Sequence, residues 1–380
     1  MSIETFGRCC DKMETHEEEG ATMPIPEALP SGARGGRVTL RTIAETAGVH
    51  ISTVSRILNN QLGDSRHTAS PETVDRVLTV AADLRYTPNP SAKSLRTSRS
   101  SHIGVLVPTL TDIVLATIYE GIEEAAERHG YSTYVTNSLD DPTRRERQTA
   151  TMLARHPDAM IFGDADFNSD FLERQSHKGV PFCLVSRRAE GFLSATTDDY
   201  RGGQLAAEHL LELGLTEAAV LAGKPFASTA IDRTNGFVDT FRDAGHPIPK
   251  HLILHGTFDT AGGREAMQSI LSTSVALDAV FATNDFAAIG AMGALRDAGL
   301  IAGGDVAVIG YNDVPLSEAI PMPLTTVRSA HNRMGQEAVE LVMKLLNGER
   351  PTSVLLPPTL VARESTLGVA AARAASSRRS

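Results

Sequence analysis

Residues 38–60 read VTLRTIAETAGVHISTVSRILNN, and this stretch decides how the chain is organised. Thr39 is a predicted N-cap, because its hydroxyl can accept a hydrogen bond from an unpaired backbone N–H of a first helical turn. Gly48 ends that short helix, and Val49 can fill the space before a second helix. The apolar residues of the first helix recur at helical spacing on one face, namely Leu40, Ile43, Ala44 and Ala47.

The second helix begins near Ile51 and directs Val54, Ile57 and Leu58 inward. Two helices joined at a glycine turn, with a hydroxyl-rich outer face on the second, predict a helix-turn-helix that binds DNA. Hydroxyls and helix N-termini bind phosphates, while Arg and Asn side chains contact base edges. An ordinary helical hairpin in a core is the alternative. The outer face comprises Ile51, Ser52, Thr53, Ser55, Arg56 and Asn59.

Two further signals follow along the chain. A third helix is predicted after Ser70 and Pro71, with an apolar face formed by Val74, Val77, Leu78, Ala81 and Leu84. The segment TPNPSAKSLRT, from Thr87, then predicts a helix of one or two turns that starts at Asn89 and is marginal alone. Residues 87–100 are therefore predicted to be a hinge or linker.

From His102 onward, apolar runs alternate with amphipathic helices. Most runs are continuous rather than alternating, which is typical of strands buried on both faces of a parallel sheet. The fold class that we predict is α/β, with an all-α helix-turn-helix headpiece and two doubly wound lobes. The runs begin at Ile103, Tyr131, Ala159, Pro181, Ala218, Asp278 and Asp305.

The net charge differs between the predicted headpiece with its hinge and the rest of the chain. The net charge of its 380 residues is −10, but residues 37–100 hold nine Arg or Lys and five Asp or Glu, so this segment carries +4 and the remainder −14. A basic module on an acidic body is expected where only one part meets phosphate. Chance fluctuation of the charge is the alternative.

Composition excludes several other classes. There is no apolar run of about 18 residues, which a membrane-spanning helix needs. No signal peptide is evident, and Cys9, Cys10 and Cys183 have neither metal-ligand spacing nor a disulfide pattern, so we expect a cytoplasmic protein. A free-standing periplasmic binding protein is disfavoured accordingly. An NAD-dependent enzyme lacks support, because no G-x-G-x-x-G follows the first run and no P-loop occurs. We expect no catalytic residue, metal or cofactor.

The chain resembles the lactose-repressor (LacI/GalR) family of bacterial transcription regulators. The resemblance is carried by VTL, IA, AGV, TVSR and LN between residues 38 and 59, by PN..A.SL from Pro88, and by IGVLVP from Ile103, and it extends to about Gly368. It implies a repressor of a catabolic operon that binds operator DNA and a small-molecule effector. Pseudo-palindromic operators further imply a homodimer. In that family the hinge helix orders on DNA and a leucine, here at Leu95, enters the minor groove; packing against the sensor is the alternative for Leu95.

Three departures from the family pattern stand in the headpiece. His50 replaces a usual serine, Thr42 replaces a usual acidic residue, and the loop that holds Arg66 and His67 is longer and is either solvated or near the DNA backbone. The predicted DNA-binding residues are Thr39, His50, Ile51, Ser52, Thr53, Ser55, Arg56, Asn59, Asn89, Lys93 and Leu95.

Effector contacts are expected beyond the carboxyl ends of the strands. Arg233 matches the family's ligand-binding arginine, and Phe258 matches an aromatic that stacks on ligand. The aliphatic pair Val114 and Leu115 disfavours a purine and leaves a sugar or, if Arg187 pairs with a carboxylate, a sugar acid. Arg187 on the lobe surface is the alternative. The predicted effector-binding residues are Val114, Leu115, Arg187, Arg233, Phe258, Asn284, Asp285, Asn312 and Asp313.

Structural roles compete with binding at some of these positions. Asp285 could cap a helix from Phe286, Arg233 could pair with Asp232 or Asp285, and Asp198 or Asp199 could cap the helix near Arg201. The expected domains are a disordered extension (1–36), the headpiece (37–86), the hinge (87–100), the effector-binding and dimerisation domain (101–368) and a disordered tail (369–380). The tail carries no leucine heptads, which favours a dimer over a tetramer.

Overall fold

The computed structural model describes residues 38–59, 69–86, 99–167, 170–273 and 275–368. The chain divides into two compact units, Met1–Pro88 and Asn89–Ser380. Among the described residues, no helix combines the length and the apolar composition that crossing a membrane requires.

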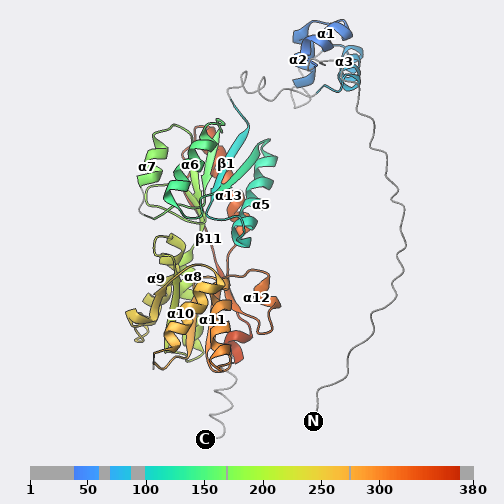
Figure 1. The fold of residues 1–380 in the computed structure, drawn as a ribbon. Coiled ribbons are helices and arrows are strands. Elements are labelled where there is room, and N and C mark those ends of the chain that lie inside the picture. The colour runs from blue at the N-terminus through green and yellow to red at the C-terminus, as the bar shows by residue number, and fades with distance from the viewer. Residues whose placement is uncertain (1–37, 60–68, 87–98, 168–169, 274, 369–380) are drawn as a thin grey trace, which may run out of the picture. The chain divides into compact units, whose positions relative to one another are not determined.

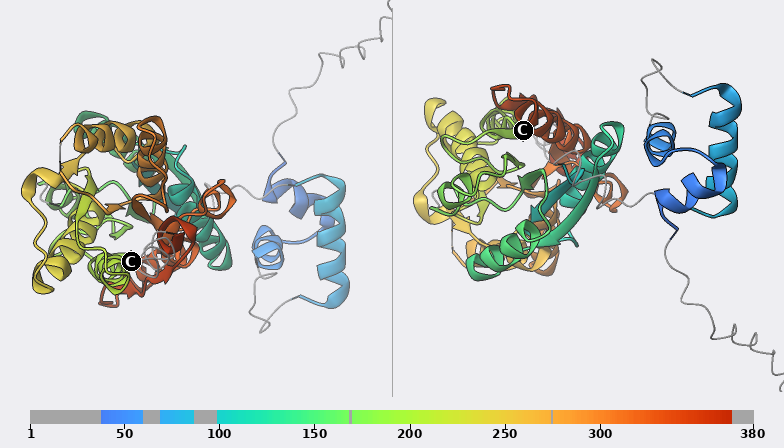
Figure 2. Two further views of the ribbon diagram at one scale, coloured as in Figure 1. Left: turned by 90° about the horizontal axis from the view of Figure 1, so that it is seen from below. Right: turned by 90° about the horizontal axis from the view of Figure 1, so that it is seen from above.

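The first unit contains three helices, α1 (Leu40–Ala47), α2 (Ile51–Asn59) and α3 (Pro71–Asp83). Both views of Figure 2 show their axes steeply inclined to one another. Thr39 caps α1 as predicted, and Thr42 completes a reciprocal capping box, so the missing acidic residue does not abolish it. Gly48 ends α1 at φ 64°, a left-handed conformation that glycine adopts without steric cost.

One small apolar core holds the three helices together. Its buried members are Ile43, Ala44, Ala47, Val54, Ile57, Val77 and Ala81, and its partly buried members include Leu40, Val49, Leu58, Val74, Leu78 and Leu84. The inward faces predicted from the helical spacing are confirmed. The helix-turn-helix therefore rests on a core in which α3 covers α1 and α2.

The second unit consists of two lobes, each built on a six-stranded sheet (Figure 1). The sheet of lobe 1 has the strand order β11-β5-β4-β3-β1-β2, and all its pairings are parallel. Lobe 1 comprises β1 (His102–Val107), α5 (Ile113–Arg128), β2 (Ser132–Asn137), α6 (Pro142–Leu153), β3 (Ala159–Phe162), α7 (Asp170–Ser176), β4 (Phe182–Val185), β5 (Ser194–Thr197), α13 (His331–Leu346) and β11 (Val354–Leu356).

The sheet of lobe 2 has the order β12-β10-β9-β8-β6-β7, and only the pair β10–β12 is antiparallel. Lobe 2 comprises α8 (Asp199–Glu212), β6 (Ala218–Gly223), α9 (Ser228–Asp243), η2 (Lys250–Leu252), β7 (Ile253–His255), α10 (Thr260–Leu271), β8 (Ala279–Ala282), α11 (Asp285–Asp297), β9 (Ala307–Asn312), α12 (Leu316–Ala319), β10 (Thr325–Arg328) and β12 (Thr359–Val361). The predicted fold class is confirmed in both units.

The chain passes between the lobes three times, from β5 to α8, from β10 to α13 and from β11 to β12. Five short strands, β5, β7, β10, β11 and β12, were not predicted: β7, β11 and β12 have only three residues, and β5 and β10 are rich in Thr. The predicted continuous runs are buried on both faces: on β1, Ile103 and Val105 enter one core of lobe 1 and Leu106 enters another.

Helices α5 and α13 of lobe 1 pack closely because glycines lie at their crossing. A Cβ built on Gly335 would lie 2.0 Å from the carbonyl oxygen of Ile118, and one on Gly121 would lie 1.9 Å from that of Asn332. Backbone at these distances cannot move aside as a flexible side chain does. Any larger residue therefore forces the two helices apart.

Gly335→Val is expected to lower the free energy of unfolding by about 3 kcal/mol, because it overpacks the crossing of α5 and α13. Urea unfolding monitored by circular dichroism measures the change. Gly256→Ala is the control, since a Cβ there would meet only the Gly262 carbonyl oxygen, at 3.9 Å, and its effect should stay within about 0.5 kcal/mol. Equal stability of the two variants would contradict the close crossing.

Candidate functional site

A cavity of about 580 Å³ opens between the two lobes of the second unit. Its volume lies within the roughly 300–1,000 Å³ that is usual for small-molecule sites. Its walls come from segments at the ends of strands: β1, β2, β3 and β4 in lobe 1, and β6, β7, β8 and β9 in lobe 2. Parallel strands bring these carboxyl ends to one edge of each sheet, where ligands of α/β proteins bind.

Most of the predicted effector residues line this one cavity, namely Val114, Leu115, Arg187, Arg233, Phe258, Asn284 and Asn312. Asp285 and Asp313 do not line it. Asp285 is fully buried and accepts hydrogen bonds from the Thr326 hydroxyl and the Val314 N–H. Burial raises the pKa of Asp285 to about 6, although these hydrogen bonds oppose the shift.

Asp313 is paired with two arginines, Arg328 at 2.6 Å and Arg363 at 2.8 Å. Together with Asp285 it holds the segment after β9 rather than facing the cavity. The neighbouring Asn312 does face it, with a φ of 111° that few residues other than glycine adopt. Among the described residues, the side-chain oxygen of Asn312 is buried and has no hydrogen-bond partner.

The structure settles which caps the acidic residues provide. Asn284, not Asp285, caps α11: its side-chain oxygen accepts from the Ala287 N–H at 2.8 Å. Its amide nitrogen donates to the Phe258 carbonyl oxygen at 2.6 Å. Asp198 caps α8 through the Arg201 N–H, as one of the two predicted alternatives for that pair requires.

Arg233 has a different partner from the two considered in the sequence. Its guanidinium donates to Asp199 at 2.7 Å and to the Thr283 carbonyl oxygen at 2.8 Å, and it stacks on the Tyr311 ring at 3.7 Å. Burial alone would lower the pKa of Arg233, but the charge and hydrogen bond of Asp199, together with Tyr311 and Asp285, outweigh burial, so the pKa is raised. Arg233 therefore presents a fixed, charged donor at the cavity wall.

Phe258 and Phe286 are the aromatic residues of the lobe 2 wall. The Phe258 ring lies against Gly223 at the end of β6, where an added Cβ would come within 2.4 Å of the ring. Gly223 also has a φ of 68°. Glycine at this position thus allows the aromatic ring to lie against the backbone beside the cavity.

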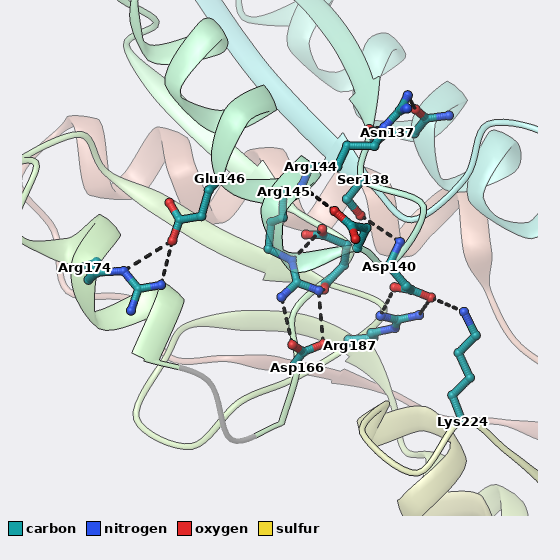
Figure 3. Close-up of polar contacts among 12 residues, drawn as sticks. Asn137, Ser138, Asp140, Arg144, Arg145, Glu146, Asp166, Arg174, Arg187 and Lys224 are labelled. Atoms are coloured by element: carbon teal, nitrogen blue, oxygen red, sulfur yellow. Dashed lines mark hydrogen bonds and ion pairs between the residues drawn. The ribbon is translucent and has the colours of Figure 1, made fainter.

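Two cavity residues that the sequence did not single out, Asp140 and Lys224, contact Arg187 or its partner. Arg187 donates to both carboxylate oxygens of Asp140, at 2.7 and 3.1 Å, and Lys224 of the opposite lobe lies 2.7 Å from the same carboxylate (Figure 3). Burial raises the pKa of Asp140, but the two cations outweigh that effect and lower it. Both follow predicted strands: Lys224 directly follows β6, and Asp140 lies three residues beyond the end of β2, so a search of the residues after each predicted strand would have found both.

A second buried network supports the loops beneath this cluster. Arg145 of α6, 1% exposed, pairs with Asp166 at 2.8 Å (Figure 3) and with Asp164 at 2.8 Å. Both carboxylates lie in the segment that follows β3. Arg145 also donates to the Asp164 carbonyl oxygen. This arginine fixes the loop after β3 to α6.

The lobes are also joined beside the cavity. Arg188 donates to both carboxylate oxygens of Asp232 on α9, and its backbone N–H donates to the Ser228 hydroxyl. The Phe167 N–H donates to the Phe226 carbonyl oxygen at 3.0 Å. Asp232 therefore pairs with Arg188 rather than with Arg233.

On the first unit, the outer face of α2 is accessible. Ile51, Ser52 and Arg56 are exposed, and Thr53 and Ser55 are partly exposed. The ring nitrogen Nδ1 of His50 accepts from the Ser52 N–H at 3.2 Å, so the imidazole caps the start of α2. The side chain of Asn59, and Asn89, Lys93 and Leu95 entirely, lie outside the described residues.

Comparison with known families follows the same division. The family described as periplasmic binding proteins and sugar binding domain of LacI family matches residues 100–364, and bacterial regulatory proteins, lacI family, matches residues 39–89. The chain belongs to the LacI family of bacterial regulatory proteins. It is thus a transcriptional regulator of that family.

Curated relatives match nearly their whole length. The chain is 30% identical over 337 residues to the HTH-type transcriptional regulator DegA of Bacillus subtilis, which covers 87% of this chain and 98% of DegA. It is 28% identical over 332 residues to the HTH-type transcriptional repressor PurR of Pasteurella multocida, covering 86% of this chain and 98% of PurR.

Solved structures show the same fold. The Lac repressor dimer bound to operator and the anti-inducer ONPF matches with a TM-score of 0.78 and 27% identity, covering 87% of this chain and 99% of that one. The complex of the transcriptional regulator CelR with cellobiose matches with a TM-score of 0.66 and 27% identity, covering 87% and 100%.

The ion pair between Arg233 and Asp199 is expected to be essential for the stability of lobe 2. Asp199→Asn leaves a buried guanidinium without its counter-charge and should cost about 3–5 kcal/mol of unfolding free energy. Thermal and urea unfolding measure the loss. Glu208→Gln is the matched control, because the Arg201–Glu208 pair is 43% and 41% exposed and should contribute less than about 1 kcal/mol. A similar loss in both variants would contradict the importance of burial.

Proposed function

We propose that this regulator represses a catabolic operon and that a sugar or sugar acid bound between the lobes controls its affinity for operator DNA. The observation that carries the proposal is the cavity, in which Arg233, Asn284 and Asn312 converge beside Phe258. Amide and guanidinium groups hydrogen-bond to hydroxyls, and an aromatic face packs against a sugar ring. The CelR structure, whose title names cellobiose, supports this class of effector.

The proposed DNA-binding surface is the outer face of α2, together with Thr39, His50, Asn59 and the hinge residues Asn89, Lys93 and Leu95. Its support is the exposure of Ser52 and Arg56 on a helix whose other face is buried. The Lac repressor structure, which is a dimer bound to operator, supports a homodimer in which two such helices read two half-sites.

The proposed division of labour follows the same boundaries as the sequence predicts: headpiece 37–86, hinge 87–100 and effector-binding and dimerisation domain 101–368. We place the protein in the cytoplasm, where it meets DNA. A catalytic role has no support from the relatives, which are regulators and repressors. We propose no cofactor or metal for its action.

Arg56→Ala is expected to weaken operator binding and its salt dependence, because Arg56 lies on the exposed face of α2. Loss of one phosphate contact should lower the slope of log K against log salt concentration by about 0.9. Fluorescence anisotropy with operator at several salt concentrations measures both. Arg76→Ala, on the exposed side of α3, is the control and should change neither. An Arg56→Ala protein with wild-type affinity and slope would remove Arg56 from the interface.

Effector and operator are expected to change each other's affinity by the same factor, roughly 5- to 150-fold, because binding couplings are reciprocal. A thermal-shift screen of sugars and sugar acids selects the effector, and titration calorimetry measures it with and without operator. Arg233→Ala should lose effector binding, whereas Arg242→Ala, which breaks only exposed ion pairs, should retain it. Equal effector affinity with and without operator would reject the coupling, and full binding by Arg233→Ala would reject the site.

A further inference from the structure

Asp140 is held in the cavity by an unusual loop conformation. Leu139 and Asp140, between β2 and α6, have φ angles of 56° and 55°, in the left-handed region that L-residues occupy at a steric cost. The Leu139 side chain remains 55% exposed, so burial of this leucine does not offset that cost. What the conformation provides is the position of the Asp140 carboxylate, whose side chain is only 6% exposed.

That position places one carboxylate between two cations of opposite lobes. Arg187 follows β4 of lobe 1, Lys224 follows β6 of lobe 2, and both line the cavity with Asp140 (Figure 3). The two cations also share the Phe226 ring, each 5.7 Å from its centroid. The cluster of Arg187, Lys224 and Asp140 therefore carries one positive charge in excess.

Among the described residues, no other charged group of the wall has a hydrogen bond to these two cations, although the buried Asp164 also interacts with the charge of Arg187. Arg233 is already paired with Asp199, and Asp259 caps α10 through the Gly262 N–H. Asp112 caps α5 through the Val114 N–H and is near enough to interact with the charge of Arg187, without a hydrogen bond to it. Asp140 is thus the anion that contacts both Arg187 and Lys224.

We propose that Asp140 is a built-in counter-ion, which an effector bearing a carboxylate or phosphate group displaces from Arg187 and Lys224. The inference rests on the proposed function, because it takes the cavity as the effector site. It selects the anionic member of the effector class: a neutral sugar leaves Asp140 in place and gains neither cation. An anionic ligand exchanges one carboxylate for another, so the cations stay paired while the strained loop is released.

This exchange determines whether a substitution at Asp140 strengthens or weakens anion binding. An anion binds only to those molecules in which Asp140 has moved away from the two cations. Its apparent affinity is then reduced in proportion to the fraction of such molecules. If Asp140 occupies the cations about nine tenths of the time, removing its charge strengthens anion binding by about tenfold. A carboxylate that merely hydrogen-bonds to the effector or supports the fold has the opposite effect, since its removal weakens binding.

The test compares Asp140→Asn with Asp141→Asn, which removes the same charge from the adjacent residue. Asp141 is exposed and caps α6 through the Arg144 N–H, a role that Asn also fills. Each full-length protein, without DNA, is titrated with inorganic phosphate and with acetate at constant ionic strength. Calorimetry and the unfolding midpoint report binding. Asp140→Asn should bind one or both anions about tenfold more tightly than wild type, and Asp141→Asn should match wild type. The anion with the larger gain identifies the group that the cations accept.

Two further variants complete the design. Adding Lys224→Met to Asp140→Asn should abolish the gain. Asp140→Gly removes the carboxylate at a φ that suits glycine, and should show the gain even if Asp140→Asn folds poorly. No gain in either Asp140 variant, an equal gain in Asp141→Asn, or a gain that survives Lys224→Met overturns the proposal. Because no operator is present, failure of operator coupling leaves this result unaffected, and the two hypotheses fail separately.

Discussion

Pairing of buried and partly buried charges in and beside the cavity is the constraint on which the sensor depends. A buried charge without a partner costs several kcal/mol, whereas a paired one fixes the groups on both sides. Arg145 fixes the loop after β3 in this way, and Arg233 joins α9 to α8 through Asp199. Arg188 and Lys224 extend the pairing from one lobe to the other. The polar wall of the cavity is thus fixed where ions are paired, as at Arg187 with Asp140 and at Arg233 with Asp199.

Much of the fold can be predicted from local patterns in the sequence. The helical spacing from Leu40 to Leu58 predicts the headpiece core, and the continuous apolar runs predict the central strands of both sheets. The missed strands lack that signal for a physical reason. β5 and β10 bury threonines rather than aliphatic side chains, and Thr325 and Thr326 are tolerated there because Ser365, Thr366 and Asp285 hydrogen-bond to them.

The candidate site was predictable to the extent that position along a strand determines it. Val114, Arg187 and Asn284 come together because each follows a predicted strand of a parallel sheet, whereas Phe258 follows β7, which was not predicted, and was expected only from the family resemblance. Which charge pairs with which depends on distances between segments far apart in sequence. The sequence around Arg233 does not indicate that its partner is Asp199. Asp232, the adjacent residue, pairs with Arg188 instead. Likewise, the sequence LDD at residues 139–141 does not indicate the left-handed backbone at Asp140.

The ion pairs between the lobes bear on how a ligand could act over a distance. A ligand shifts a conformational equilibrium only by its differential affinity for the two states. A molecule that contacts a single wall has little difference in affinity for the two states. One that replaces Asp140 contacts Arg187 and Lys224 together, and hence both lobes, in place of a carboxylate that belongs to lobe 1 alone. The pair of Arg188 with Asp232 is more exposed at its arginine, 41% against 6% for Arg187, so solvent screens it more and it opposes relative movement of the lobes less. The cation cluster, rather than that pair, is therefore where a ligand can exert the larger bias on the spacing of the lobes.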